Sequence, residues 1–359
     1  MTAPIRSVIS ASGCFIPPNR VPNDAFLQHE FWDQKGRKIE KSNAEILQQF
    51  QAITGIRERR YVSDEMVTSD VAAEAARAAL ESSGIDPTSL DYIIVAHNFG
   101  DVRAGSRRSD LVPSLAARVK NKLRIRSPRP AAYDLIFGCP GWLQGMIQGD
   151  ALIRAGAAQR VMVIGSETLS RVSDPHDRDS LIYSDGGGAT ILEARETTET
   201  VGVLAHAVRS DSIEQLEMLF MARSYHPEMI GDELFLKMEG RKLYRYALET
   251  VAGTIKKCLD DVGLAIGEVT KILLHQANGK MDEAILDALY DLYGQEPPPG
   301  VMPMTIGWLG NSSVATLPTL YDLLVRGQLD GQTIASGDVL VFASVGAGMH
   351  INAIVYRMP

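Results

Sequence analysis

Residues 72–97 read AAEAARAALESSGIDPTSLDYIIVAH, and this segment decides the fold class of the 359-residue chain. Apolar residues recur at helical spacing up to Gly84, which ends the predicted helix, and a turn then leads into the apolar run of a buried strand. Residues 251–275, VAGTIKKCLDDVGLAIGEVTKILLH, repeat this order, with the strand core at the same distance from Gly263. We interpret the match as an internal repeat.

A second pair of segments supports the repeat. After Cys139 a helical pattern reaches Arg154, and a short apolar strand follows. After Asn311 a similar pattern reaches Arg326 at the same spacing, and again an apolar strand follows. A chance match is disfavoured because both pairs repeat in the same order, so Cys139 and Asn311 are predicted to hold equivalent positions.

Short apolar strands that alternate with helices indicate sheets covered by helices on both faces. With the repeat, this pattern predicts an α/β fold built from two duplicated halves. The polar run ARETTETVG marks the break, and we place one half at residues 1–196 and the other at 197–359.

Charge and cysteine content limit the partners and the compartment. The formal net charge of −8 argues against binding of nucleic acid. Three cysteines do not form a disulfide framework, and this usage fits a reducing cytoplasm. We find no signal-peptide pattern and no apolar run of the ~20 residues that span a bilayer. A soluble, cytoplasmic protein without membrane insertion is expected.

Cys139 lies in the segment DLIFGCPGW, between a predicted strand and a predicted helix that has Pro140 as its first residue. A thiol over a helix N-terminus is favoured in its thiolate form, which is the nucleophile. The alternative is a buried structural cysteine, and the motif alone leaves it open.

His275 and Asn311 add polar groups to the same region of the predicted fold. His275 ends a buried strand at its carboxyl end, where open α/β folds place their chemistry, although a structural histidine is the alternative. Asn311 starts the helix equivalent to that of Cys139, where Asn commonly serves as an N-cap. A near two-fold axis between the halves would bring the two helix starts to one pocket, with His275 beside them.

The motifs FGCPGW, LLHQAN and GNSS resemble the Cys, His and Asn signatures of the β-ketoacyl-ACP synthase III family, a branch of the thiolase-fold enzymes. TGIRERR at 54–60, MEGRKLYRYALE at 238–249 and SVGAGM at 344–349 also follow the family order. The resemblance implies a thiolase-like fold, in which two duplicated α/β halves form five αβαβα layers.

The resemblance also implies a decarboxylative Claisen condensation that needs neither metal nor cofactor. Cys139 would take an acyl group from a thioester donor, either acyl-CoA or acyl-ACP. His275 and Asn311 would bind the carbonyl of malonyl-ACP, and the backbone N–H groups of Cys139 and Gly348 would form the oxyanion hole. The product would be a β-ketoacyl-ACP of fatty acid or related polyketide biosynthesis.

Basic residues are expected to receive the carriers. By the resemblance, Arg178 would touch the coenzyme A nucleotide, and Arg245 and Lys280 would contact the acyl carrier protein. Residues 103–129 carry nine Lys or Arg and one acid, so they either extend this docking patch or form a solvated basic face.

Several positions depart from the family pattern. Gln49 stands near the place of a tryptophan that often stacks on coenzyme A, which favours acyl-ACP as the donor. Met349 and Val112 occupy channel positions, the latter reaching the partner subunit of an expected homodimer. These smaller or softer groups suggest a primer longer than acetyl. Residues 29–43 and 211–233 look like insertions, and the second either roofs an acyl channel or packs on the core as a helix.

Three alternative functions remain open on the sequence. A specialised ketosynthase or acyltransferase of secondary metabolism, including resorcinol-forming and head-to-head condensing enzymes, would share the same three polar residues. A non-catalytic subunit is disfavoured because Cys139, His275 and Asn311 are all present. A thiolase or hydroxymethylglutaryl-CoA synthase activity needs a second Cys or a Glu base, which neither SVGAGM nor YIIVAHNF clearly supplies.

Overall fold

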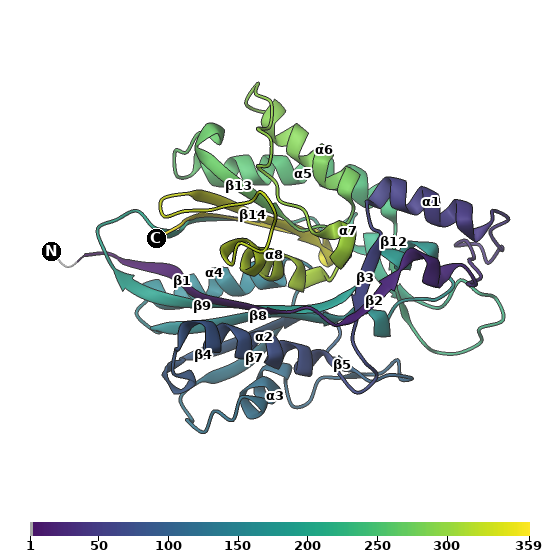
Figure 1. The fold of residues 1–359 in the computed structure, drawn as a ribbon, viewed down its shortest axis with the longest axis horizontal. Coiled ribbons are helices and arrows are strands. Elements are labelled where there is room, and N and C mark those ends of the chain that lie inside the picture. Colours follow the sequence, from purple (N-terminus) through teal and green to yellow (C-terminus); the bar gives the residue numbers. More distant parts are fainter. Residues whose placement is uncertain (1–2) are drawn as a thin grey trace.

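The computed structural model describes residues 3–359 and contains two mixed sheets that are each flanked by helices (Figure 1). The first sheet has the order β1-β9-β8-β4-β7 and the second has the order β10-β15-β14-β13. The first comprises β1 (Ile5–Phe15), β9 (Asp185–Glu196), β8 (Arg160–Thr168), β4 (Tyr92–His97) and β7 (Ala131–Ile136). The second comprises β10 (Gly202–Ser210), β15 (His350–Arg357), β14 (Val339–Gly346) and β13 (Val269–Leu274).

The two sheets share one topology, which confirms the predicted duplication. β1 pairs antiparallel with β9 as β10 does with β15, and β4 pairs parallel with β8 as β13 does with β14. Only the first sheet continues beyond this common set, to the edge strand β7. The strands before and after the 196/197 division belong to different sheets, and the division into two domains there stays a prediction.

Helices complete five layers (Figure 1). The outer face of the first sheet is covered by α2 (Thr68–Ser83) and α3 (Leu115–Lys122), and that of the second by α5 (Gly240–Asp260) and α6 (Gly279–Asp291). Between the sheets lie α4 (Gly141–Arg154) and α8 (Thr316–Val325). This arrangement is the predicted αβαβα thiolase-like fold.

The central position of α8 explains its composition, because a helix between two sheets is buried all round. Nine of its ten residues are buried. Its one acid, Asp322, accepts hydrogen bonds from Ser12 Oγ at 2.7 Å and Arg326 Nε at 2.8 Å, which satisfy the carboxylate. No helix within residues 3–359 combines the length and apolarity required to cross a bilayer.

Two helix starts differ from the sequence prediction. Pro140 is the N-cap of α4 rather than its first helical residue. Asn311 is not an N-cap, because its backbone forms a parallel bridge with Tyr183. Its N–H donates to the Ile182 carbonyl at 2.9 Å and its carbonyl accepts from Ser184 N–H at 2.8 Å. Helical structure begins only at the 3₁₀ turn Ser313–Ala315, which leads into α8.

The inserted segments are mostly irregular. Residues 29–42 form a loop, and Asn43 already begins α1 (Asn43–Thr54). The segment 211–233 is not a packed helix, because it contains β11 (Leu219–Ala222), which forms a hairpin with β12 (Phe235–Met238). The remaining short elements are β2 (Asn19–Pro22), β3 (Glu58–Tyr61), β5 (Asp101–Val102), β6 (Ser109–Asp110) and α7 (Ile306–Leu309).

Candidate active site

The structure brings Cys139, His275 and Asn311 together around one cavity of about 50 Å³. The three residues come from three distant segments: the turn before α4, the end of β13 and the loop before α8. Two further polar residues, Asn98 and Ser313, complete the polar side of the cavity. The rest of the lining is mainly apolar: Leu169, Ile182, Tyr183, Leu219, Leu236, Met238, Leu243, Ala277, Met281, Val345 and Ala347.

The Cys139 side chain is half-buried, and its backbone packs closely against the loop that carries Gly346. A Cβ added at Gly346 would lie 2.7 Å from the backbone nitrogen of Cys139, so this contact requires glycine. Burial raises the pKa of Cys139 to about 11, a hydrogen bond from Ser313 acts in the opposite direction, and the charge of Glu167 raises it further. The thiolate that the helix end was expected to favour is thus opposed by burial, and it stays a prediction.

His275 is held as a neutral imidazole. Its backbone N–H donates to the Ala343 carbonyl at 2.8 Å, which continues the pairing of β13 with β14. Burial lowers the pKa of His275 to about 4, and its Nδ1 atom has no hydrogen-bond partner among residues 3–359. At neutral pH the ring thus carries a single N–H, which is available to a ligand oxygen.

The Asn311 amide has one defined orientation. Its Oδ1 atom accepts the backbone N–H of Ser313 at 2.8 Å. With the oxygen fixed in this way, the Nδ2 group is the part of the amide that remains free to donate. The lining of the cavity therefore includes two neutral donors, from His275 and Asn311, together with a thiol.

A hydrogen-bonded chain connects the thiol to a buried carboxyl group. Ser313 Oγ lies 3.3 Å from Cys139 Sγ, Asn98 Nδ2 lies 3.1 Å from Ser313 Oγ, and Asn98 also binds Glu167. Asn98, Glu167 and Ser313 were not predicted as site residues. Asn98 and Glu167 stand at the carboxyl ends of buried strands, the signal that identified His275, so the same criterion could have found them.

The hairpin of β11 and β12 covers the apolar side of the cavity. Leu219 from β11, with Leu236 and Met238 from β12, lines it. Lys237 lies between them in β12, and its Nζ atom reaches Asp174 and Asp177 instead, because alternate side chains of a strand point to opposite faces. Segment 211–233 was predicted either to roof an acyl channel or to pack on the core as a helix. Leu219 of this segment lines the cavity, which agrees with the first interpretation.

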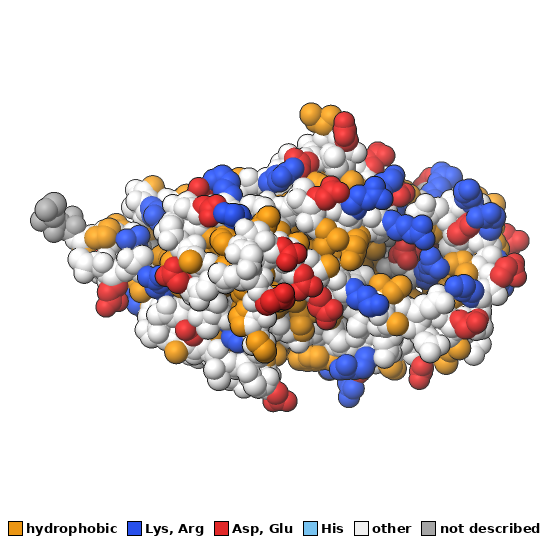
Figure 2. All heavy atoms as spheres, turned by 90° about the horizontal axis from the view of Figure 1, so that it is seen from above, with side chains coloured by type: hydrophobic (Ala, Val, Ile, Leu, Met, Phe, Trp, Pro, Cys, Tyr) orange, Lys and Arg blue, Asp and Glu red, His pale blue; other side chains and the backbone are white. Residues whose placement is uncertain are grey.

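The predicted carrier-binding residues lie outside the cavity and are exposed. Arg178 begins the turn that supplies Ile182, Arg245 lies in α5 close to Leu243, and Lys280 precedes Met281 in α6. Seen from above, Lys and Arg side chains gather over the part of the molecule where Figure 1 places α1 and the start of α6 (Figure 2). The exposed ends of the elements that line the cavity are therefore basic.

Other predicted positions are not part of this cavity within one chain. Met349 is fully buried in the core of the second half and does not line it. Val112 is 85% exposed on a surface loop. Gly348, with φ of +78°, belongs to the loop that packs on Cys139 but is not a lining residue. Gln49 is exposed in α1, where it accepts a hydrogen bond from Lys41.

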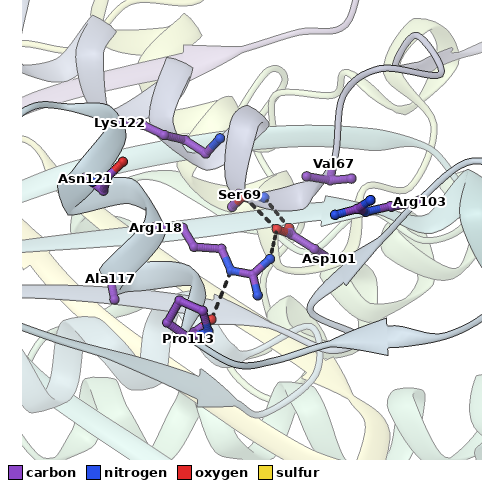
Figure 3. Close-up of a pocket in the computed structure, with 9 residues that line it drawn as sticks. All are labelled: Val67, Ser69, Asp101, Arg103, Pro113, Ala117, Arg118, Asn121 and Lys122. Atoms are coloured by element: carbon purple, nitrogen blue, oxygen red, sulfur yellow. Dashed lines mark hydrogen bonds and ion pairs between the residues drawn. The ribbon is translucent and has the colours of Figure 1, made fainter.

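The basic segment 103–129 is neutralised in part, because three of its nine basic residues form ion pairs. Figure 3 shows Arg118 in a surface hollow of about 520 Å³, where it binds Asp101 at 2.7 Å and donates to the Pro113 carbonyl at 2.9 Å. Lys122 pairs with Asp70 and Arg129 with Asp91. These contacts leave less free charge for docking than the sequence suggests, and they hold the loop that carries Val112.

Comparisons with known proteins identify the family of the chain. The family model described as 3-oxoacyl-[acyl-carrier-protein] synthase III matches residues 133–212, and the model of its C-terminal part matches residues 259–358. The β-ketoacyl-[acyl-carrier-protein] synthase III of Cereibacter sphaeroides is 33% identical over 357 residues, which are 98% of this chain and 99% of that protein.

Solved structures are similar over the whole chain. 3-Oxoacyl-(acyl carrier protein) synthase III, FabH, from Pseudomonas aeruginosa PAO1 aligns with a TM-score of 0.80 and 25% identity, covering 99% of this chain and 98% of that one. The priming β-ketosynthase of the R1128 polyketide pathway shares the fold, with a TM-score of 0.81 at 23% identity over 100% and 98% of the two chains. On the family models and the curated relative, this chain belongs to the β-ketoacyl-acyl-carrier-protein synthase III family of acyl-transferring condensing enzymes.

Proposed function

We propose that this protein joins an acyl group, carried on Cys139, to a malonyl group on an acyl carrier protein by decarboxylative condensation. The observation that carries the proposal is the one cavity that Cys139, His275 and Asn311 line together, which supplies a thiol and two neutral hydrogen-bond donors. Membership of the β-ketoacyl-acyl-carrier-protein synthase III family supports the same reaction.

The first half-reaction is transfer of the acyl group to sulfur. The Cys139 sulfur attacks the donor thioester, a new S–C bond forms, and the C–S bond to the carrier breaks. The thiol proton leaves with the departing carrier thiol. The backbone N–H groups of Cys139 and Gly348 would stabilise the oxyanion of the tetrahedral intermediate, and the close packing of the Gly346–Gly348 loop on Cys139 supports this role.

The second half-reaction needs donors rather than a base. As the malonyl group loses carbon dioxide, negative charge develops on its thioester oxygen, and the N–H groups of His275 and Asn311 would bind that oxygen. The lowered pKa of His275 favours this role, because a neutral imidazole donates without needing to lose a proton. The enolate carbon then attacks the acyl carbonyl on Cys139 and expels the sulfur.

Carrier binding and assembly belong to the same proposal. Exposed Arg245 and Lys280 would contact the acidic carrier protein, and Arg178 would contact a nucleotide-bearing donor. A homodimer would form through the free edge of β7, supported by exposed apolar Ile136 and Val112. The reaction would take place in the cytoplasm, which the sparse cysteines support.

A second candidate is a ketosynthase of secondary metabolism that runs the same chemistry on another primer. Gln49 in place of the expected stacking tryptophan favours it, as does the apolar roof formed by Leu219, Leu236 and Met238. The third alternative, a glutamate-dependent synthase, is weakened because Glu167 is separated from the cavity by Asn98.

The test combines intact mass with carbon dioxide release. The wild-type protein, incubated with acyl donors of increasing chain length, should gain one acyl mass, and Cys139→Ala should abolish it. Cys258→Ala is the matched control, because Cys258 is buried in the second half and should not carry the adduct. Malonyl-ACP should then release carbon dioxide and remove the adduct. An adduct that persists without carbon dioxide release would contradict condensation and favour simple acyl transfer.

A further inference from the structure

Beyond the thiol, imidazole and amide, one hydroxyl group touches the reacting sulfur. Ser313 Oγ lies 3.3 Å from Cys139 Sγ, and Ser313 is buried. Its backbone adopts a left-handed conformation, with φ of +52°, which turns the side chain toward Cys139 while its N–H holds Asn311 Oδ1 at 2.8 Å. A single residue therefore contacts two members of the proposed catalytic set.

The direction of the hydrogen bonds follows from their partners. Asn98 donates twice to Glu167 Oε1, through its backbone N–H at 2.6 Å and through Nδ2. A backbone N–H can only donate, so this carboxyl oxygen is an acceptor toward Asn98 and orients the amide with Nδ2 inward. The second hydrogen of Nδ2 is then available to Ser313 Oγ at 3.1 Å.

Ser313 is consequently left with one hydrogen to donate. Its oxygen accepts from Asn98, and among residues 3–359 its hydroxyl has no other side-chain partner than Asn98 and Cys139. The hydroxyl hydrogen therefore points to the sulfur. A thiolate is a stronger acceptor than a thiol, so such a bond favours the charged, nucleophilic form.

We propose that Ser313 is a further catalytic residue, which donates a hydrogen bond to the Cys139 sulfur, and that Asn98 and Glu167 are positioning residues that set its direction. The inference rests on the proposed function in taking Cys139 as the nucleophile. Ser313 keeps its own proton during acyl transfer, since the thiol proton leaves with the carrier thiol. Its contribution is to stabilise negative charge on sulfur as the S–C bond forms.

Glu167 has two opposite effects on the Cys139 thiolate, so the direction in which a Glu167 variant changes thiol reactivity tests the proposal. Its hydrogen bonds to Asn98 support the donor role of Ser313, whereas its negative charge opposes a second negative charge on Cys139. Asp185 on β9 and His97 on β4 are the charged or titratable neighbours that act on Glu167, and His97 is in turn paired with Asp134 on β7.

Ser313→Ala isolates the hydroxyl, because alanine keeps the N–H that holds Asn311. Alkylation of Cys139 by iodoacetamide, followed by peptide mass spectrometry across the alkaline range, reports the thiolate without any acyl donor or malonyl carrier. We expect the rate near neutral pH to fall on the order of ten-fold and the pKa of the thiol to rise by about one unit. Ser312→Ala, which removes a neighbouring buried hydroxyl that does not contact Cys139, should leave the profile unchanged.

Glu167→Gln tests the positioning residues. Glutamine retains an acceptor oxygen for Asn98 and loses the charge, so the alkylation rate should rise, opposite to the effect of Ser313→Ala. Superimposable profiles for wild type and Ser313→Ala would overturn the catalytic role of Ser313. A lower alkylation rate in Glu167→Gln than in wild type would overturn the roles assigned to Asn98 and Glu167. Because alkylation needs no condensation, either result is distinguishable from failure of the proposed reaction.

Discussion

At the scale of the residue, burial controls the protonation states in this site. His275 and Cys139 line the same cavity, and burial disfavours the charged form of each. Burial thus favours a neutral imidazole that can donate, and it favours the protonated form of the thiol. Burial therefore suits the enolate-binding role proposed for the histidine. It opposes the thiolate form of Cys139, which the hydrogen bond from Ser313 favours.

His275 should make stability depend on pH. The pKa of His275 is lowered from 6.5 to about 4 in the folded chain, so the unfolded chain binds the proton first as the pH falls. The stability that this lowered pKa contributes is fully present above pH 6.5. It is lost progressively as the pH falls toward 4, and the unfolding free energy decreases by roughly 3 kcal/mol in total. Urea unfolding of wild type and His275→Gln at several pH values should show the difference in unfolding free energy change by this amount. The other buried acids occur in both proteins, so their contributions cancel in the difference. A difference in unfolding free energy that does not change with pH would contradict a buried neutral imidazole.

At the scale of the element, the hairpin of β11 and β12 is held over the cavity from its outer face. Lys237 Nζ lies 2.5 Å from Asp174 and 3.1 Å from Asp177, and all three groups are buried. The backbone N–H of Leu236 donates to the Val172 carbonyl at 2.9 Å. Strand alternation thus gives one face of β12 to the cavity and the other to an ion-pair anchor.

Removal of the anchor should be costly. Lys237→Met leaves two buried carboxyl groups without their cation, and we expect the unfolding free energy to fall by about 3 kcal/mol. Lys242→Met is the matched control, because Lys242 is 67% exposed and pairs with Glu239 only at 3.6 Å, a contact worth less than about 1 kcal/mol. Chemical denaturation of both variants measures the difference. Equal stability losses would show that Lys237 does not anchor the hairpin.

At the scale of the whole molecule, the two sheets differ in one respect that concerns assembly. β7 is the outermost strand of the first sheet and has no counterpart in the second. Ile136 at its end is 64% exposed and Val112 is 85% exposed. Arg118 donates to the carbonyl of Pro113, the residue after Val112 (Figure 3). An unpaired strand edge with exposed apolar groups is suited to pairing with a second copy of the chain.

Ile136→Asp should weaken the proposed dimer by placing a charge at its centre. Sedimentation velocity over a range of concentrations should show the dimer dissociation constant increase at least ten-fold, the effect of about 1.4 kcal/mol. Val208→Asp is the control, since Val208 is 59% exposed on β10, the edge strand of the other sheet. If Val208→Asp dissociates the dimer and Ile136→Asp does not, the interface lies on the second sheet.

The sequence by itself determined the duplicated α/β fold and the three polar residues of the site. Hydrophobic periodicity and glycine stops are local properties, so the repeat of residues 72–97 in 251–275 could be recognised without coordinates. Cys139 and His275 were identified because they stand where predicted apolar strands end, and Asn311 because it holds the place equivalent to Cys139 in the repeat. The predicted helix starts differ from the structure, by one residue at Pro140 and more at Asn311, whose backbone pairs with Tyr183 instead.

Only the tertiary structure decided which groups surround the thiol and what burial does to them. The contact of Ser313 with Cys139, the support from Asn98 and Glu167, and the roof of Leu219, Leu236 and Met238 join segments far apart in the chain. The pKa of Cys139 likewise depends on how completely those segments exclude water. Desolvation and hydrogen-bond direction are properties of three-dimensional packing, and no local pattern of residues encodes them.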